Sequence, residues 1–223
     1  KKLGERRVHP IFGIPGGVTR PLLPEDREWI LKQIDDQIAT AQVGVDFFKT
    51  WAGGHMDMVN EFAVFPSAYM GLVQEDGALE LYDGTLRMVD KEGELLEEFD
   101  PVDYLDYIGE HVNNYTYLKA PFYKKRGYPE GVYRVGPLGR LNAASHISTP
   151  IAQGEMKIWK DMNGGKPVEG TLYFHYARLI ETIYALERVK ELMDDPEILG
   201  KDVVNPQGPI SGEGVGVPVS YTH

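Results

Sequence analysis

The chain has 223 residues, of which 42% are hydrophobic and 26% charged, so it can bury a core without a disulfide or a structural metal. Its formal net charge of −11 argues against nucleic acid and anionic membrane surfaces as partners, because both attract clusters of Lys and Arg. Cysteine is absent, which excludes disulfides, thiolate catalysis and thiolate metal ligands within these residues. No apolar run approaches the ~20 residues of a membrane span.

The N-terminal residues are basic but are not followed by the apolar stretch of a signal peptide. There is no initiator Met, and we expect a segment of a longer chain. Residues 9–24 are rich in proline and glycine. Within them Pro15, Gly16 and Gly17 predict a tight turn, because proline presets φ and glycine permits positive φ.

A long helix is predicted over residues 24–52. Pro24 suits the first helical position, and Glu25 and Asp26 suit the positive end of the helix dipole. Apolar residues then recur every three or four positions, at Ile30, Ile34, Ile38, Ala41, Val45 and Phe48. Gly53 and Gly54 should end the helix. A helix of roughly 40 Å is typical of a bundle member.

A small antiparallel β-meander is predicted over residues 69–99. Asp-Gly and Glu-Gly pairs, which favour hairpin turns, separate four short apolar runs. These runs are Tyr69–Val73, Leu79–Tyr82, Leu86–Val89 and Leu95–Phe99.

The remaining residues predict three helices separated by loops. Residues 101–112 favour a short helix, 113–149 a loop-rich aromatic region, 150–161 a helix, and 167–193 a second long helix that ends before Pro196. The final stretch is a glycine- and proline-rich loop. The predicted fold class is α+β and mainly helical, with long bundle helices and a small antiparallel meander.

Residue patterns that carry chemistry are weak. The six histidines (His9, His55, His111, His146, His175 and His223) form no helical pair with metal-ligand spacing. Paired carboxylates occur in polar surroundings, where solvation is the better explanation. The segment Gly212–Gly216 lacks the Lys-Ser/Thr of a phosphate-binding loop.

The segment 134–142, RVGPLGRLN, is the unusual feature, because Arg134, Arg140 and Asn142 bracket a conformationally demanding turn. It is either a buried loop whose arginines satisfy carbonyl groups or a scaffold beside a cofactor. The residues alone leave both interpretations open.

RVGPLGRLN also resembles a segment of [NiFe] hydrogenase large subunits of the soluble type, which comprises NAD(P)-linked bidirectional and F420-non-reducing enzymes. Five further motifs resemble that family in the same order along the chain. They are His9-Pro10 with Pro15–Val18, Leu79–Gly84, Tyr117–Pro121, His175–Glu181 and Gly212–Val217.

The resemblance implies that residues 1–217 are an interior portion of one large-subunit domain. The family cleaves and forms H₂ at a Ni–Fe centre held by four cysteines in two C-x-x-C pairs, one near each end of the full subunit, so no ligand is expected here. His9 matches a loop that faces the proximal iron–sulfur cluster of the small subunit, and Pro15, Gly16 and Gly17 would hold that loop. The resemblance makes Arg134, Arg140 and Asn142 candidates for supporting the metal site from behind or for subunit contact.

The match ends at residue 217, and residues 218–223 are expected to be a non-native tail, so the family's arginine above the metal site has no counterpart here. The implied partners are an iron–sulfur small subunit, together with a diaphorase or other electron-transfer module, in the cytoplasm. The isolated segment should be inactive. An alternative is a non-catalytic homologue, such as the hydrogenase-like subunit of respiratory complex I that serves quinone binding.

Overall fold

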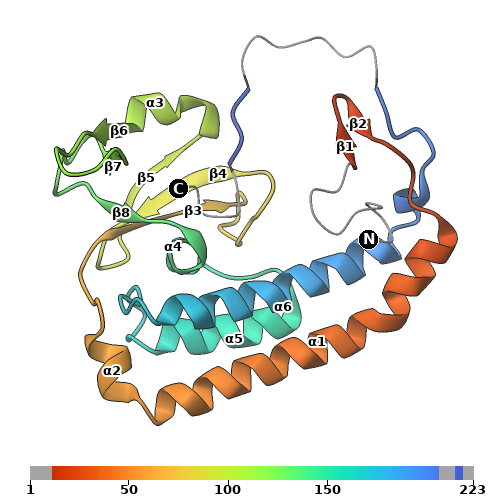
Figure 1. Cartoon of the computed structure of the whole chain (residues 1–223), viewed down its shortest axis with the longest axis horizontal. Helices are drawn as coiled ribbons and strands as arrows, with labels where there is room; N and C mark the ends of the chain where they lie inside the picture. Colours follow the sequence, from red (N-terminus) through yellow and green to blue (C-terminus); the bar gives the residue numbers. More distant parts are fainter. Residues whose placement is uncertain (1–11, 206–213, 218–223) are drawn as a thin grey trace.

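The computed structural model describes residues 12–205 and 214–217, and it is an α+β fold in which long helices lie beneath a small sheet (Figure 1). The helices are α1 (Pro24–Gly53), α2 (Met56–Glu61), α3 (Tyr104–Tyr107), α4 (Gly136–Ala143), α5 (Pro150–Asp161) and α6 (Tyr173–Asp194). Short 3-10 helices cover Pro101–Asp103 and Pro196–Leu199. The strands are β1 (Gly13–Ile14), β2 (Gly17–Val18), β3 (Ala68–Val73), β4 (Thr85–Val89), β5 (Leu95–Phe99), β6 (Ile108–His111), β7 (Ala120–Tyr123) and β8 (Tyr133–Arg134).

The two longest helices, α1 and α6, pack side by side and run antiparallel (Figure 1). Arg27, near the start of α1, donates a hydrogen bond to the carbonyl of Met193, near the end of α6. Farther along the pair, Lys190 Nζ lies 2.7 Å from Asp35 Oδ1. The helix predicted over residues 24–52 is present as α1. Within the described part of the chain, no helix is both long and apolar enough to cross a membrane.

Helix α5 lies along α6, and a carboxylate of α6 caps its N-terminus. Glu187 Oε2 accepts hydrogen bonds from Thr149 Oγ1 at 2.6 Å and from the Ala152 amide at 2.9 Å, while Oε1 accepts one from the Ile151 amide at 2.8 Å. These amides belong to the first turn, whose donors have no partner within the helix. Thr149, at the N-cap position, makes no side-chain cap bond of its own. The buried Glu187 of α6 caps the helix instead.

Aromatic side chains fill the space between the three helices. Tyr176 stacks on Phe48 with ring centroids 5.7 Å apart and tilts against Trp159 at 5.8 Å. Its hydroxyl donates to Glu155 Oε2 at 2.6 Å, and burial together with this carboxylate raises the pKa of the phenol. Glu155 also pairs with Lys49 of α1 at 2.6 Å. One carboxylate of α5 therefore joins all three helices.

The sheet has the strand order β5-β4-β3-β8. Antiparallel pairs join β3 to β4 and β4 to β5, as predicted, whereas β8 adds a parallel strand that the sequence did not indicate. Alternate residues of β3 divide between two layers. Tyr69 and Val73 join the main core with the helices, while Leu72 faces a smaller cluster with Leu86 and Phe99.

The predicted strand Leu79–Tyr82 is wrong. Only a single bridge joins Leu79 to Val73, and the backbone then turns away. Glu80 Oε1 accepts hydrogen bonds from the amides of Leu81 and Tyr82, at 2.7 and 3.0 Å. A side chain thus takes the donors that a neighbouring strand would have used.

Two predicted helices differ in extent. The helix expected over residues 101–112 stops at Tyr107, because Ile108–His111 forms a strand that pairs with Ala120–Tyr123. The second long helix begins at Tyr173 rather than near residue 167. The amide and the carbonyl of Val168 both bond to the Asn142 side chain, so this residue is not available to the helix.

The turn predicted within RVGPLGRLN is also wrong, because most of this segment is α4, whose residues are all buried. Pro137 occupies the first helical turn. A Cβ at Gly139 would meet the carbonyl oxygens of Arg134 at 2.5 Å and Met70 at 2.9 Å. A Cβ at Gly71 would meet Arg140 Cα at 2.7 Å. The two glycines let α4 lie directly on β3.

Replacement of Gly139 by Ala should therefore destabilise the chain by about 2–4 kcal/mol, since the obstructing atoms are backbone and must move. Gly154→Ala is the matched control, because a Cβ there meets open space within α5. It should add about 0.5–1 kcal/mol from helix propensity. Urea unfolding of both variants measures the difference, and equal stabilities would contradict the close packing.

Candidate functional site

Arg134 stands at the end of β8 and ties together three separate segments of the chain. Its Nε donates to Ser67 Oγ at 2.9 Å and its Nη1 to the Glu169 carbonyl at 2.5 Å, while Nη2 donates to the Phe65 carbonyl. The guanidinium also lies over the rings of Phe65 and Tyr69, with its carbon 4.2 and 5.2 Å from the centroids. Burial raises the pKa of the Tyr69 phenol. Arg134 thus donates to carbonyls of its own chain and packs against the rings of Phe65 and Tyr69.

Arg140 forms a buried, bidentate ion pair with Glu181 of α6. Its Nε donates to Oε1 at 2.6 Å and its Nη2 to Oε2 at 2.7 Å, in the parallel geometry that arginine and carboxylate prefer. The two side chains are only 9% and 8% exposed. The pair fixes the position of α4 on α6. Its two hydrogen bonds offset the free-energy cost of burying the two charges.

Asn142, two residues further along α4, joins three elements through its amide. Its Nδ2 donates to the Val168 carbonyl at 2.9 Å, and its Oδ1 accepts from the Val168 amide at 3.0 Å and from Trp159 Nε1 at 3.1 Å. The Asn142 carbonyl lies 3.3 Å from Lys160 Nζ. The amide pairs with the segment before α6 as a strand would, and it orients the tryptophan at the centre of the core.

The predicted turn at Pro15-Gly16-Gly17 is present as the β1–β2 hairpin. Gly16 and Gly17 have φ values of 85° and 158°, and a Cβ on either would meet a backbone carbonyl, that of Asn205 at 2.5 Å or of Val203 at 2.0 Å. The Asn205 amide donates to the Gly16 carbonyl at 2.8 Å. The glycines thus allow the hairpin to dock against residues 203–205, which follow α6.

The candidates therefore occupy two places. Arg134, Arg140 and Asn142 gather around α4, whereas the hairpin lies where α1 begins and α6 ends (Figure 1). His9, predicted to face a cluster of the partner subunit, lies outside the described residues.

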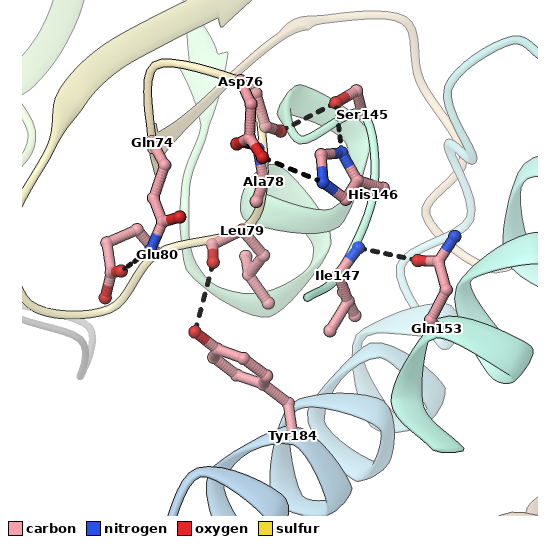
Figure 2. Close-up of polar contacts among 11 residues, drawn as sticks. Gln74, Asp76, Ala78, Leu79, Glu80, Ser145, His146, Ile147, Gln153 and Tyr184 are labelled. Carbon is pink, nitrogen blue, oxygen red and sulfur yellow. Dashed lines mark hydrogen bonds and ion pairs between the residues drawn. The ribbon is translucent and has the colours of Figure 1, made fainter. Parts of the chain in front are cut away.

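The segment after α4 joins a turn of the sheet through a dense set of polar contacts, drawn in Figure 2. The Leu79 amide donates to the His146 carbonyl at 2.8 Å, and the Tyr184 hydroxyl donates to the Leu79 carbonyl at 3.2 Å. His146 Nε2 lies 3.4 Å from Asp76 Oδ2, and its Nδ1 lies 2.9 Å from Ser145 Oγ. These contacts hold the turn that the sequence misassigned to a strand.

The described residues hold no group of three or more His, Cys, Asp or Glu side chains suited to a metal ion. His55 and His111 stack instead on Trp51 and Tyr128, at 4.9 and 4.0 Å between ring centroids. Sequence patterns did not single out Glu181 or Glu187 as partners. Both are buried on α6, although a spacing of six sets them about 120° apart around the helix, and acidic residues within a largely apolar helix are the available signal.

No protein-family model matches the chain. The vhu F420-non-reducing hydrogenase of Methanococcus voltae has one subunit that is 42% identical over 214 residues, which are 96% of this chain and 50% of that protein. The β subunit of the NAD-reducing hydrogenase HoxS of Cupriavidus necator is 36% identical over 220 residues, which are 95% of this chain and 45% of that protein.

The homologues of this chain are hydrogenase subunits. A chain in the crystal structure of an NAD⁺-reducing [NiFe]-hydrogenase in the H₂-reduced state has the same fold, with a TM-score of 0.83 and 29% identity. That alignment covers 90% of this chain and 45% of the other. The chain thus spans about half the length of the hydrogenase subunits it matches.

Loss of the carboxylate charge at Glu181 should destabilise the chain by about 3–5 kcal/mol, because Glu181→Gln removes a buried charge that pairs with Arg140. Glu191→Gln on the same helix is the control. It breaks an exposed pair with Arg188 and should change stability by less than about 0.5 kcal/mol. Urea unfolding measures both, and a loss below about 1 kcal/mol for Glu181→Gln would contradict the role assigned to the pair.

Lys160 gives a pH-dependent prediction. No carboxylate of the described residues lies within ion-pair distance of its ammonium, and burial, aided by the nearby Arg87, lowers its pKa to about 8. The unfolded chain holds this proton up to about pH 10.4, so folding carries a penalty below pH 8 that disappears as the pH rises.

The stability of the wild-type chain relative to Lys160→Met should accordingly increase between about pH 8 and 10.5. Unfolding of the two proteins across this range measures the difference. A constant difference would show that the lysine does not lose its proton in the folded state.

Proposed function

We propose that this chain is the interior half of the nickel-bearing large subunit of a cytoplasmic [NiFe] hydrogenase, an enzyme that oxidises H₂ and reduces protons. The observation that carries the proposal is the combination of 42% identity over 96% of the chain with a shared fold at a TM-score of 0.83. Sequence and fold agree over nearly the same residues, and this agreement supports common descent.

The Ni–Fe centre does not fit the residues of this chain. Its thiolate ligands would have to come from elsewhere, because the chain contains no cysteine and the described residues offer no alternative ligand cluster. No step of the metal chemistry is therefore assigned to these residues. In the intact subunit the ligands would lie in the two C-x-x-C pairs outside this span.

The proposed roles of the chain are structural and partner-facing. The side-chain donors of Arg134, Arg140 and Asn142 are directed to acceptors within the chain, which supports a role in fixing the backbone behind the metal site. The close packing of Gly16 and Gly17 against residues 203–205 supports a role of the hairpin, which His9 precedes in the sequence, in presenting a surface to an iron–sulfur small subunit. A diaphorase or similar module would accept the electrons.

A chimeric subunit tests this proposal. The span of the Methanococcus voltae protein that matches this chain is replaced by residues 1–217, and the product is purified with its natural partners. We expect bound nickel and H₂-dependent viologen reduction within about tenfold of the parent, which is about 1.4 kcal/mol in the barrier.

The isolated chain is the control and should show neither nickel nor activity. A chimera that folds and binds its partners but lacks both would contradict the proposal.

A further inference from the structure

A ridge of apolar side chains follows α2 and faces solvent. It comprises residues 62–66 (Phe-Ala-Val-Phe-Pro), all of them exposed, with Phe62 at 55%, Val64 at 40% and Phe65 at 46%. Met58 lies one helical turn before Phe62, whose amide donates to the Met58 carbonyl at 2.9 Å. Its side chain is 44% exposed and extends the ridge. Five consecutive uncharged residues of this kind are unusual on a free surface.

The backbone of the ridge is held firmly from the inside. Thr171 Oγ1 donates to the Ala63 carbonyl at 2.6 Å, and Arg134 donates to the Phe65 carbonyl and packs against the Phe65 ring at 4.2 Å. Ala63 has a φ of 48°, in the left-handed region that non-glycine residues rarely adopt. The hydrogen bonds to Ala63 and Phe65 and the strained backbone at Ala63 therefore hold the segment in a conformation that leaves its apolar side chains exposed.

We infer that this ridge is the seam at which the other half of the same polypeptide packs, an inference that rests on the proposed function. The matched hydrogenase subunits are single chains of about twice this length, so each holds as much polypeptide again that is available to pack against this half. An uncharged ridge resembles a domain core cut in two, whereas a transient partner would meet a polar, charged rim. The carbonyls of Ala63 and Phe65 are already bonded, so contact is made through the side chains.

Oxidative footprinting of side chains tests the seam directly. Hydroxyl radicals label exposed Met, Phe and Tyr, and the rates are compared between the isolated 223-residue chain and the chimeric subunit. We expect Met58, Phe62 and Phe65 to be labelled in the isolated chain and protected about fivefold or more in the chimera. Tyr117, which is 93% exposed in the described structure, serves as the internal reference.

Equal labelling of the ridge in both proteins would overturn the inference. Concentration-dependent protection in the isolated chain would overturn it too, since a second copy would then be the occupant. Nickel content and H₂ activity are measured separately. An active chimera with a labelled ridge refutes only the seam, and an inactive chimera with a protected ridge refutes only the hydrogenase assignment.

Paired substitutions give an independent test. Phe62→Glu combined with Val64→Glu should leave the melting temperature of the isolated chain nearly unchanged, because these side chains face solvent there. The same change should lower the yield of protease-resistant chimera about fivefold or more. Val112→Glu, at a position 69% exposed, should alter neither. Undiminished chimera yield with both glutamates would contradict the inference.

Discussion

The ion pair between Arg140 and Glu181 is the constraint around which the rest of the structure is organised. It places two charges where almost no water reaches, and such a pair is stable only when both partners are held in register. Register requires α4 to lie against β3 on one side and α6 on the other. The first contact depends on Gly71 and Gly139, and the second on the carboxylate itself. A sheet and a helical bundle are thus joined through one eight-residue helix.

Polar side chains take over the role of regular secondary structure at several joints of this fold. Asn142 substitutes for a strand neighbour, Glu187 for a helix cap, and Glu80 for a turn partner. Asn142 and Glu187 satisfy backbone groups that burial would otherwise leave unpaired. Arg134 does the same for the carbonyls of Phe65 and Glu169, which lie in two separate segments, and the first of these bonds helps to hold the outward-facing ridge. Side chains that are distant in sequence thus join the elements of the fold to one another.

This reliance on distant side chains explains what the sequence could predict. The repeating apolar positions of α1 and the Glu92-Gly93 turn between β4 and β5 are local signals, and the elements they indicate are present. The turn at Gly16 and Gly17 is equally local. The strand at Leu79–Tyr82 fails because Glu80 binds the amides of Leu81 and Tyr82, and α6 starts later because Asn142 binds the backbone of Val168. Arg134, Arg140 and Asn142 stand out in the sequence as unusual, but their partners are set by tertiary contacts that no spacing reveals.

The functional account depends on the Ni–Fe ligands being supplied by polypeptide outside this span. Reading the gene on both sides of the coding segment tests that claim most directly. We expect one open reading frame that continues in both directions and encodes a C-x-x-C pair on each flank. A continuous frame that lacks both pairs would contradict the claim, and it would favour a non-catalytic homologue of the hydrogenase fold.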